Sequence, residues 1–306
     1  MPLDPQIKKI LDSLKGTPTM EAMSVQDLRN SMLVVPSELR TKVGNVKNFS
    51  ITFDSCSIPV RLYEPDVITR KGLTVFFHGG GYMIGNLETH DHVCRDLCSE
   101  SGAPVLSVDY RLAPEHKFPA ATDDCFQAAC WAAENAEQLN IDTNRIVLAG
   151  DSAGGTLAAV TALRMRDDAR YNPCAQVLVY PVTDYHTPGT PSYIENADGY
   201  VLTRAAMIRF WDEYLDNAEQ SSHPYASPLR ADKFEGLPRT LILTAEFDPL
   251  RDEGRMYAER LRKSGVTVTH WNHDGMIHGF FRMSLASTRA KEAVTRTAQW
   301  ISDAMI

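Results

Sequence analysis

The sequence predicts an α/β fold in which a mostly parallel sheet of eight strands carries helices on both faces. Six short, mostly apolar runs alternate with helical stretches, as the buried strands of a parallel sheet require. A glycine-rich turn with a serine at its apex joins one of these runs to a helical stretch, which is a second mark of such a sheet. The six runs are Leu73–Phe77, Val105–Val108, Ile146–Ala149, Val177–Tyr180, Thr240–Ala245 and Val266–Trp271.

Two further strands are predicted ahead of these runs. Apolar and polar residues alternate across residues 49–53 and again across residues 58–62, with Asp54-Ser55-Cys56-Ser57 between them. Alternation of this kind is typical of a strand with one buried face. We therefore expect an antiparallel hairpin at the edge of the sheet, which brings the number of strands to eight.

Two segments outside the strands are predicted to form helices. Ile7, Ile10, Leu11 and Leu14 recur at helical spacing, and Ser24 with Asp27 resembles the start of a second helix that runs through Met32. About sixty residues separate the runs Val177–Tyr180 and Thr240–Ala245, far more than one crossover needs. They contain an aromatic-rich amphipathic stretch, Tyr200–Asp216.

These segments predict a domain organisation. We expect residues 46–190 and 223–306 to form the main domain, with residues 191–222 inserted into it as a cap. Residues 1–45 are predicted to contribute their helices to the same cap. The alternative is that both segments are ordinary packing helices, with Tyr200–Asp216 acting as a plain crossover helix.

Composition excludes several classes of function. The 306 residues are 43% hydrophobic, enough for one large domain with a small cap. With 31 basic and 39 acidic residues, the net charge is -8, and no basic cluster could hold a phosphate backbone, so a nucleic-acid partner is not expected. The start of the chain does not resemble a signal peptide, and no apolar run reaches membrane-spanning length. We therefore expect a cytoplasmic protein without a membrane partner.

The cysteines and nearby histidines raise the question of a metal site. Six cysteines are scattered along the chain, which favours free thiols over a disulfide framework. Cys94 and Cys98 lie four residues apart on a predicted helix, just after His90 and His92. Burial of small apolar cysteines explains this pattern without a closed set of ligands, so no metal is expected.

The serine at position 152 is the candidate nucleophile. It stands in Gly150-Asp151-Ser152-Ala153-Gly154-Gly155, between the strand Ile146–Ala149 and a helical stretch. A turn that lifts a serine out of a sheet strains its backbone, and Gly150 and Gly154 are small enough to permit it. The helix N-terminus that follows places the Ala153 N–H where it could stabilise an oxyanion. The alternative is a glycine-rich turn that only closes a crossover.

A second glycine-rich motif, His78-Gly79-Gly80-Gly81, follows the strand Leu73–Phe77. Glycines leave backbone N–H groups uncovered, so Gly80 and Gly81 are predicted to complete an oxyanion hole with Ala153. His78 is interpreted as a support for this loop rather than as a base. A flexible loop or a phosphate-binding turn are the alternatives, but no Lys-Ser/Thr pair follows the glycines.

A serine nucleophile needs a base, and the base needs a carboxylate. Asp248 comes shortly after the strand Thr240–Ala245, and His278 follows the last predicted strand, so both would reach the same edge of the sheet as Ser152. His273 competes with His278 but is closer to the strand end. Asp252 and Glu253 fall at a helix start, where acidic residues are favoured by the helix dipole, and are interpreted as structural.

The motifs together carry a family resemblance. His78-Gly79-Gly80-Gly81, Gly150-Asp151-Ser152-Ala153-Gly154-Gly155, Asp248-Pro249-Leu250 and Gly275-Met276-Ile277-His278-Gly279-Phe280 occur in the order that the hormone-sensitive-lipase-like family of carboxylesterases shows, in its bacterial branch. Tyr110-Arg111-Leu112-Ala113-Pro114-Glu115 is similar to a structural segment of that family.

The resemblance implies an α/β-hydrolase fold with a helical cap and the hydrolysis of short- to medium-chain acyl esters. It implies a Ser152, Asp248 and His278 triad, small-molecule ester substrates, no cofactor, and a monomer or homodimer. Three alternatives stay open: an amidase or lactonase with the same triad, a lipase acting at lipid interfaces, and a small-ligand receptor without catalysis. His278 argues against the receptor, because the plant hormone receptors that resemble this family lack that histidine.

Overall fold

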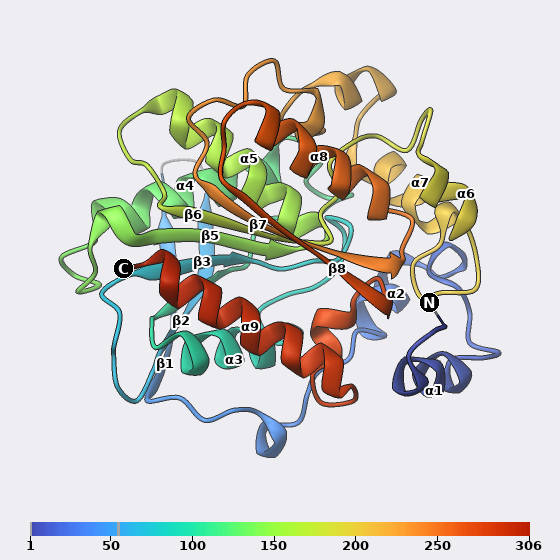
Figure 1. Ribbon diagram of the computed structural model, residues 1–306, viewed down its shortest axis with the longest axis horizontal. Coiled ribbons are helices and arrows are strands. Elements are labelled where there is room, and N and C mark those ends of the chain that lie inside the picture. Colours follow the sequence, from blue (N-terminus) through green and yellow to red (C-terminus); the bar gives the residue numbers. More distant parts are fainter. Residues whose placement is uncertain (1, 54–55) are drawn as a thin grey trace.

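The computed structural model describes residues 2–53 and 56–306, and within them the strands form one sheet of eight. The order across the sheet is β1-β2-β4-β3-β5-β6-β7-β8 (Figure 1). The strands are β1 (Asn45–Thr52), β2 (Ser57–Glu64), β3 (Leu73–Phe77), β4 (Val105–Val108), β5 (Ile146–Asp151), β6 (Ala175–Val179), β7 (Arg239–Phe247) and β8 (Val268–Ile277).

The pairing of the strands confirms the predicted α/β class. β1 pairs with β2 and β2 with β4 in antiparallel fashion, and the pairs from β4 through β8 are parallel. The predicted edge hairpin is therefore present as β1 and β2. Asp54 and Ser55 of its predicted turn lie outside the described residues, as does Met1.

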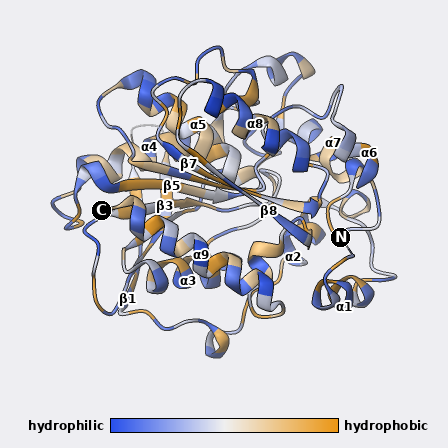
Figure 2. Ribbon diagram, viewed as in Figure 1, coloured by the Kyte–Doolittle hydropathy of each residue, from blue (hydrophilic) through white to orange (hydrophobic). Residues whose placement is uncertain are grey.

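Helices cover both faces of the sheet, because the central strands are apolar on both sides. All five residues of β3 are buried: Val75 and Phe77 join the hydrophobic core on one face and Phe76 the core on the other. α4 (Ala120–Glu134), α5 (Ala153–Asp168) and α8 (Arg251–Lys263) cover the first face. α3 (Asp91–Ser101) and α9 (Thr288–Ala304) cover the second, and Figure 2 shows apolar strands between helices whose outer faces are polar.

Four further helices gather at the carboxyl ends of the parallel strands, on the right in Figure 1. They are α1 (Pro5–Ser13), α2 (Val25–Asn30), α6 (Pro191–Glu195) and α7 (Arg204–Tyr214). α2 is shorter than predicted, and α7 is shorter than the predicted stretch Tyr200–Asp216, because the Thr203 side chain accepts from the Ala206 N–H and caps the helix there. Short 3₁₀ helices connect the elements: η1 (Met20–Ala22), η2 (Ser37–Leu39), η3 (Thr143–Arg145), η4 (Ala218–Ser222), η5 (Pro228–Arg230) and η6 (Phe280–Met283).

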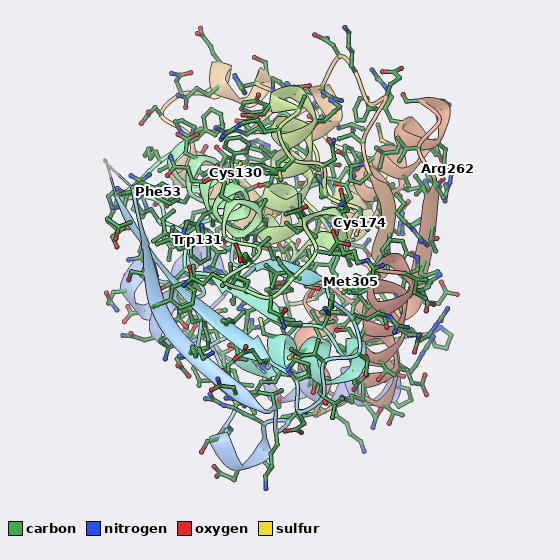
Figure 3. The ribbon with its side chains drawn as sticks, turned by 90° about the vertical axis from the view of Figure 1, so that its left-hand side faces the viewer. Phe53, Cys130, Trp131, Cys174, Arg262 and Met305 are labelled. Atoms are coloured by element: carbon green, nitrogen blue, oxygen red, sulfur yellow. The ribbon has the colours of Figure 1, made fainter. Side chains whose placement is uncertain are left out.

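The opposite end of the molecule, seen in Figure 3, carries the amino ends of the parallel strands. There the β1 and β2 hairpin packs on α4, with the rings of Phe49 and Trp131 5.5 Å apart. Figure 3 shows Phe53 and Trp131 at this junction, and Cys174 just before β6. All six cysteines lie within the described residues and all are unpaired, as predicted.

The last strand differs from its prediction of Val266–Trp271. β8 runs along the full length of β7, from the pair Thr240 and Val268 to the pair Phe247 and Ile277, across a register shift after Ala245. The Glu246 carboxylate bridges this irregularity by accepting from the Gly275 N–H at 2.6 Å. The prediction was wrong because the polar residues from 272 onward hide a strand that is held by backbone pairing. As a result, His278 is the first residue after the strand.

Candidate active site

Ser152 stands at a sharp turn between β5 and α5. Its backbone adopts φ 54°, a conformation that is strained for a residue with a side chain. Space around the turn is closed: a Cβ on Gly154 would overlap the carbonyl oxygen of Phe77, and one on Gly150 would overlap the backbone of Gly154. The Ser152 N–H donates to Val179 O at 2.8 Å and fixes the turn to the neighbouring strand. The turn therefore has the strained geometry that its glycines predicted.

The structure brings Asp248 and His278 to this serine. His278 Nε2 lies 2.9 Å from Ser152 Oγ, and His278 Nδ1 lies 2.7 Å from Asp248 Oδ2. Asp248 is fully buried where β7 ends, and its Oδ1 accepts from the Leu250 N–H at 2.9 Å. Since a carboxylate only accepts, Nδ1 carries the imidazole proton and Nε2 accepts from the serine hydroxyl. This is the tautomer in which a histidine can take up a serine proton.

The glycine loop after β3 faces the same site. Gly80 and Gly81 have φ values of 131° and 57°, in the range that favours glycine. A Cβ on Gly80 would overlap the carbonyl oxygen of Ile84, and one on Gly81 would overlap the ring of Phe210. Within the described residues, no acceptor is bonded to the N–H groups of Gly80, Gly81 and Ala153. These three predicted donors are thus free to bind a ligand oxygen.

His78 lies beneath this loop. It is fully buried, its Nδ1 lies 2.9 Å from Gly79 O, and its ring stacks on Tyr110 with the centroids 4.3 Å apart. The Tyr110 hydroxyl donates to His78 O at 2.7 Å. Burial, together with the nearby His90, lowers the pKa of His78 to about 3, so the ring is neutral at pH 7. A neutral, buried imidazole is compatible with the supporting role predicted for it.

Asp151 directly precedes Ser152, and its side chain has a role that the motif alone does not indicate. Its Oδ1 accepts from the Gly79 N–H at 2.9 Å and lies 3.3 Å from His90 Nε2, and its Oδ2 accepts from the Tyr180 hydroxyl at 3.4 Å. Burial opposes its ionisation, but His90, the charge of Arg282 and the Gly79 N–H outweigh that effect and hold the pKa of Asp151 at about 2. The carboxylate thus joins the serine turn to the glycine loop.

The alternatives considered for the acid and the base lie elsewhere. His273 is inside β8, where its ring is 4.8 Å from that of Phe280. Asp252 accepts from the Ser192 N–H at 3.0 Å, and Glu253 accepts from the Thr183 N–H at 2.7 Å. Both carboxyl groups hold backbone from the 183–192 segment against α8, which agrees with a structural interpretation.

The histidines and cysteines near α3 have structural surroundings. His92 Nε2 lies 3.0 Å from Arg282 O, and burial lowers the pKa of His92 to about 4. Cys94 and Cys98 are fully buried. Among the residues that the structure describes, no group of three His, Cys, Asp or Glu side chains could hold a metal ion.

A cavity of about 90 Å³ opens onto Ser152 and His278. One wall is the edge of the sheet at which Ser152 and His278 lie, with Gly80 and Gly81 beside the serine. The other walls come from the segments that lie over the strand ends, and they are mostly apolar. Their lining side chains are Met20 and Met32 from the N-terminal segment and Val201, Leu202, Met207, Phe210 and Trp211 from around α7.

Comparison with known proteins decides the family. Residues 74–282 match the family described as alpha/beta hydrolase fold. The chain belongs to this family. It is similar to the carboxylesterase NlhH of Mycobacterium tuberculosis, with 40% identity over 96% of this chain and 93% of the relative. An arylesterase of Saccharolobus solfataricus is 36% identical over 96% of both chains.

Solved structures agree with this assignment. A hyperthermophilic esterase from the archaeon Pyrobaculum calidifontis superposes with a TM-score of 0.95 at 41% identity, covering 99% of both chains. These similarities confirm the resemblance to hormone-sensitive-lipase-like carboxylesterases and the prediction of a serine hydrolase. No helix in the described part of the chain is long and apolar enough to span a bilayer.

Proposed function

We propose that the protein is a carboxylesterase that hydrolyses short- to medium-chain acyl esters through an acyl-enzyme intermediate on Ser152. The observation that carries the proposal is the hydrogen-bonded chain from Ser152 Oγ through His278 to Asp248, which ends in a small, mostly apolar cavity. The relatives named carboxylesterase and arylesterase support the choice of esters as substrates.

In the first half of the reaction, Ser152 Oγ attacks the ester carbonyl carbon while His278 Nε2 takes the serine proton. Asp248 stabilises the imidazolium that forms and keeps the ring in place. The tetrahedral intermediate then collapses, its bond to the alcohol oxygen breaks, and the alcohol leaves with the proton from Nε2. The product of this half is an acyl ester on Ser152.

In the second half, water attacks the acyl carbon and gives its proton to Nε2. Collapse of the second tetrahedral intermediate breaks the bond to Ser152 Oγ, which regains a proton from the imidazolium, and the carboxylic acid is released. In both halves the N–H groups of Gly80, Gly81 and Ala153 bind the oxyanion. Losing one such donor typically costs about 3 kcal/mol of transition-state stabilisation.

We also propose that residues 1–45 and 191–222 act together as a cap over the domain formed by residues 46–190 and 223–306. Two contacts support this pairing of the segments. The Arg209 Nη1 on α7 donates to the carbonyl oxygens of Met20 at 2.7 Å and Met23 at 2.5 Å. The Thr203 hydroxyl donates to Glu21 Oε2 at 3.2 Å. Both segments contribute apolar lining to the cavity, so the cap would select the acyl and alcohol groups.

Replacing the nucleophile tests the proposed function. Ser152→Ala should lower kcat for p-nitrophenyl butyrate by about 10⁴-fold or more while the circular dichroism spectrum is unchanged. Ser107→Ala is a matched control, since Ser107 is also buried but lies in β4, away from the cavity. Initial rates across acyl chains of two to twelve carbons would measure the size of the acyl site. Full turnover by Ser152→Ala would refute the assignment.

A further inference from the structure

Arg282 places a positive charge in the wall of the cavity beside the proposed nucleophile. It follows His278 by four residues and lies in η6. It lines the same cavity as Ser152 and His278. Among the described residues that line this cavity, Arg282 is the only one with a permanent positive charge. The covering segments contribute apolar side chains to this cavity, so Arg282 is a charged group beside an apolar wall.

The guanidinium group has weak partners. Arg282 Nη2 donates to Leu33 O at 3.3 Å and to Thr89 O at 3.5 Å, and Nη1 lies 4.0 Å from the Met32 sulfur. Nε is buried and has no hydrogen-bond partner within residues 2–53 and 56–306. No carboxylate in those ranges forms an ion pair with Arg282. Its charge is therefore balanced by no direct contact.

Three other half-buried arginines of this chain pair with a buried carboxylate, whereas Arg70 and Arg209 donate to carbonyl oxygens. Arg40 and Arg61 both pair with the buried Asp91, and Arg111 pairs with the buried Asp124 at 2.7 Å. Burying an arginine without a carboxylate is unfavourable, because the lost hydration is not replaced. Asp151 contributes to the field at Arg282 but lies beyond ion-pair distance and is already bonded to the Gly79 N–H. Arg282 therefore keeps an unsatisfied donor and an unpaired charge at the wall of the cavity.

We infer that Arg282 binds a carboxylate of the substrate, so that the preferred esters carry a free carboxylate on the acyl or the alcohol side. This inference rests on the proposed function of Ser152. Guanidinium recognises a carboxylate through parallel N–H donors, and such charge-assisted bonds are strong in an apolar cavity. Because the chain has a net charge of -8, its overall field disfavours anionic substrates, and a local cation is needed to accept them.

Matched substrates test the inference. The neutral ester is p-nitrophenyl butyrate, the acyl-side anion is mono-p-nitrophenyl succinate, and the alcohol-side anion is 4-carboxyphenyl butyrate. For the favoured anion, Arg282→Met should lower the kcat/KM ratio of anionic to neutral ester by about 10- to 100-fold. Arg282→Lys should restore part of that ratio. If the ratio falls for mono-p-nitrophenyl succinate, the carboxylate is on the acyl side. If it falls for 4-carboxyphenyl butyrate, the carboxylate is on the alcohol side.

Arg209→Met is the matched control, because Arg209 donates to carbonyl oxygens of the N-terminal segment. Its loss is expected to change kcat/KM for all three esters by the same factor. The loss of the anionic-to-neutral ratio in Arg282→Met relative to wild type should also shrink as NaCl rises from 0.02 to 0.5 M, because the field of the rest of the chain acts on both proteins. The inference is overturned if the ratios are unchanged in Arg282→Met, or if the difference between wild type and Arg282→Met does not respond to salt. Absence of turnover of all three esters by the wild type would instead contradict the proposed function.

Discussion

The two sides of the cavity are built in different ways. On the sheet side, Ser152, Asp248 and His278 directly follow β5, β7 and β8, and each is fixed by backbone or by a buried partner. On the covering side, apolar side chains such as Met20 and Phe210 come from short helices and connecting segments. Few polar bonds tie those segments to one another. The groups proposed to do chemistry are therefore rigidly positioned, whereas the groups proposed to choose the substrate are packed on top of them.

The largest effect is expected on the sheet side. Asp248→Asn should keep the shape of the site but present an amide N–H to His278 Nδ1, which favours the wrong tautomer. We expect kcat for p-nitrophenyl butyrate to fall by about 10⁴-fold with little change in KM. Asp252→Asn, four residues further along the chain, is the control, since Asp252 bonds to the Ser192 N–H instead. Equal losses in the two variants would remove Asp248 from the proposed triad.

The second-largest effect is expected where the two sides meet, at Gly81 and Phe210. Gly81→Ala puts a methyl group into the ring of Phe210 and should displace an oxyanion donor, lowering kcat by about 10²-fold. Adding Phe210→Ala makes room for that methyl group. We expect the double variant to recover at least part of the lost kcat, as measured in a double-mutant cycle. Strictly additive losses of kcat in the two variants would show that Phe210 on α7 does not influence the position of Gly81.

A smaller effect is expected on the covering side. Arg209→Ala removes the donors to Met20 O and Met23 O and should loosen the N-terminal segment over the cavity. We expect KM for p-nitrophenyl butyrate to rise several-fold, with kcat changed by less than about threefold. Steady-state kinetics on acetate, butyrate and octanoate esters would show whether chain-length preference also broadens. A fall in kcat at constant KM would contradict the separation of the two sides.

The smallest effect on activity is expected at Glu253, a carboxyl group buried in α8. Burial raises its pKa well above the ordinary value. A raised pKa in the folded state means that this group favours folding below the pKa of the unfolded chain and loses that contribution as pH rises through the folded pKa. Glu253→Gln can still accept from the Thr183 N–H but does not ionise. We therefore expect the Tm of the variant, relative to wild type, to increase from pH 5 to pH 8.

Differential scanning calorimetry at several pH values would measure this difference. Glu235→Gln serves as the control, because that residue is exposed and should show no comparable trend. A Tm difference between Glu253→Gln and wild type that is constant across this range, or that falls with pH, would show that the Glu253 carboxyl is ionised in the folded protein.

The two sides also differ in how far the sequence could predict them. Ser152, Asp248 and His278 could be brought together because each follows an apolar run, and parallel strands end at one edge of a sheet. The end of β8 could not be predicted, because the polar residues after Trp271 are held by pairing with β7 rather than by burial. No local pattern marks such a strand.

Long-range contacts on the covering side could not be predicted from the sequence either. Nothing in the sequence indicates that Phe210 closes over Gly81, or that Arg209 binds the carbonyl oxygens of Met20 and Met23. The role of Asp151 could have been suspected from its place beside Ser152, but its partners Gly79 and His90 are about seventy and sixty residues away along the chain.

Covalent labelling can identify the nucleophile. A fluorophosphonate reacts with a serine only where a base and an oxyanion hole activate it. Peptide mass spectrometry of the inactivated protein is expected to place one phosphonyl group on Ser152, with esterase activity lost in proportion to labelling and with labelling strongly slowed in His278→Ala. Stoichiometric inactivation with the label on another side chain, or full activity in a protein labelled at Ser152, would show that Ser152 is not the nucleophile.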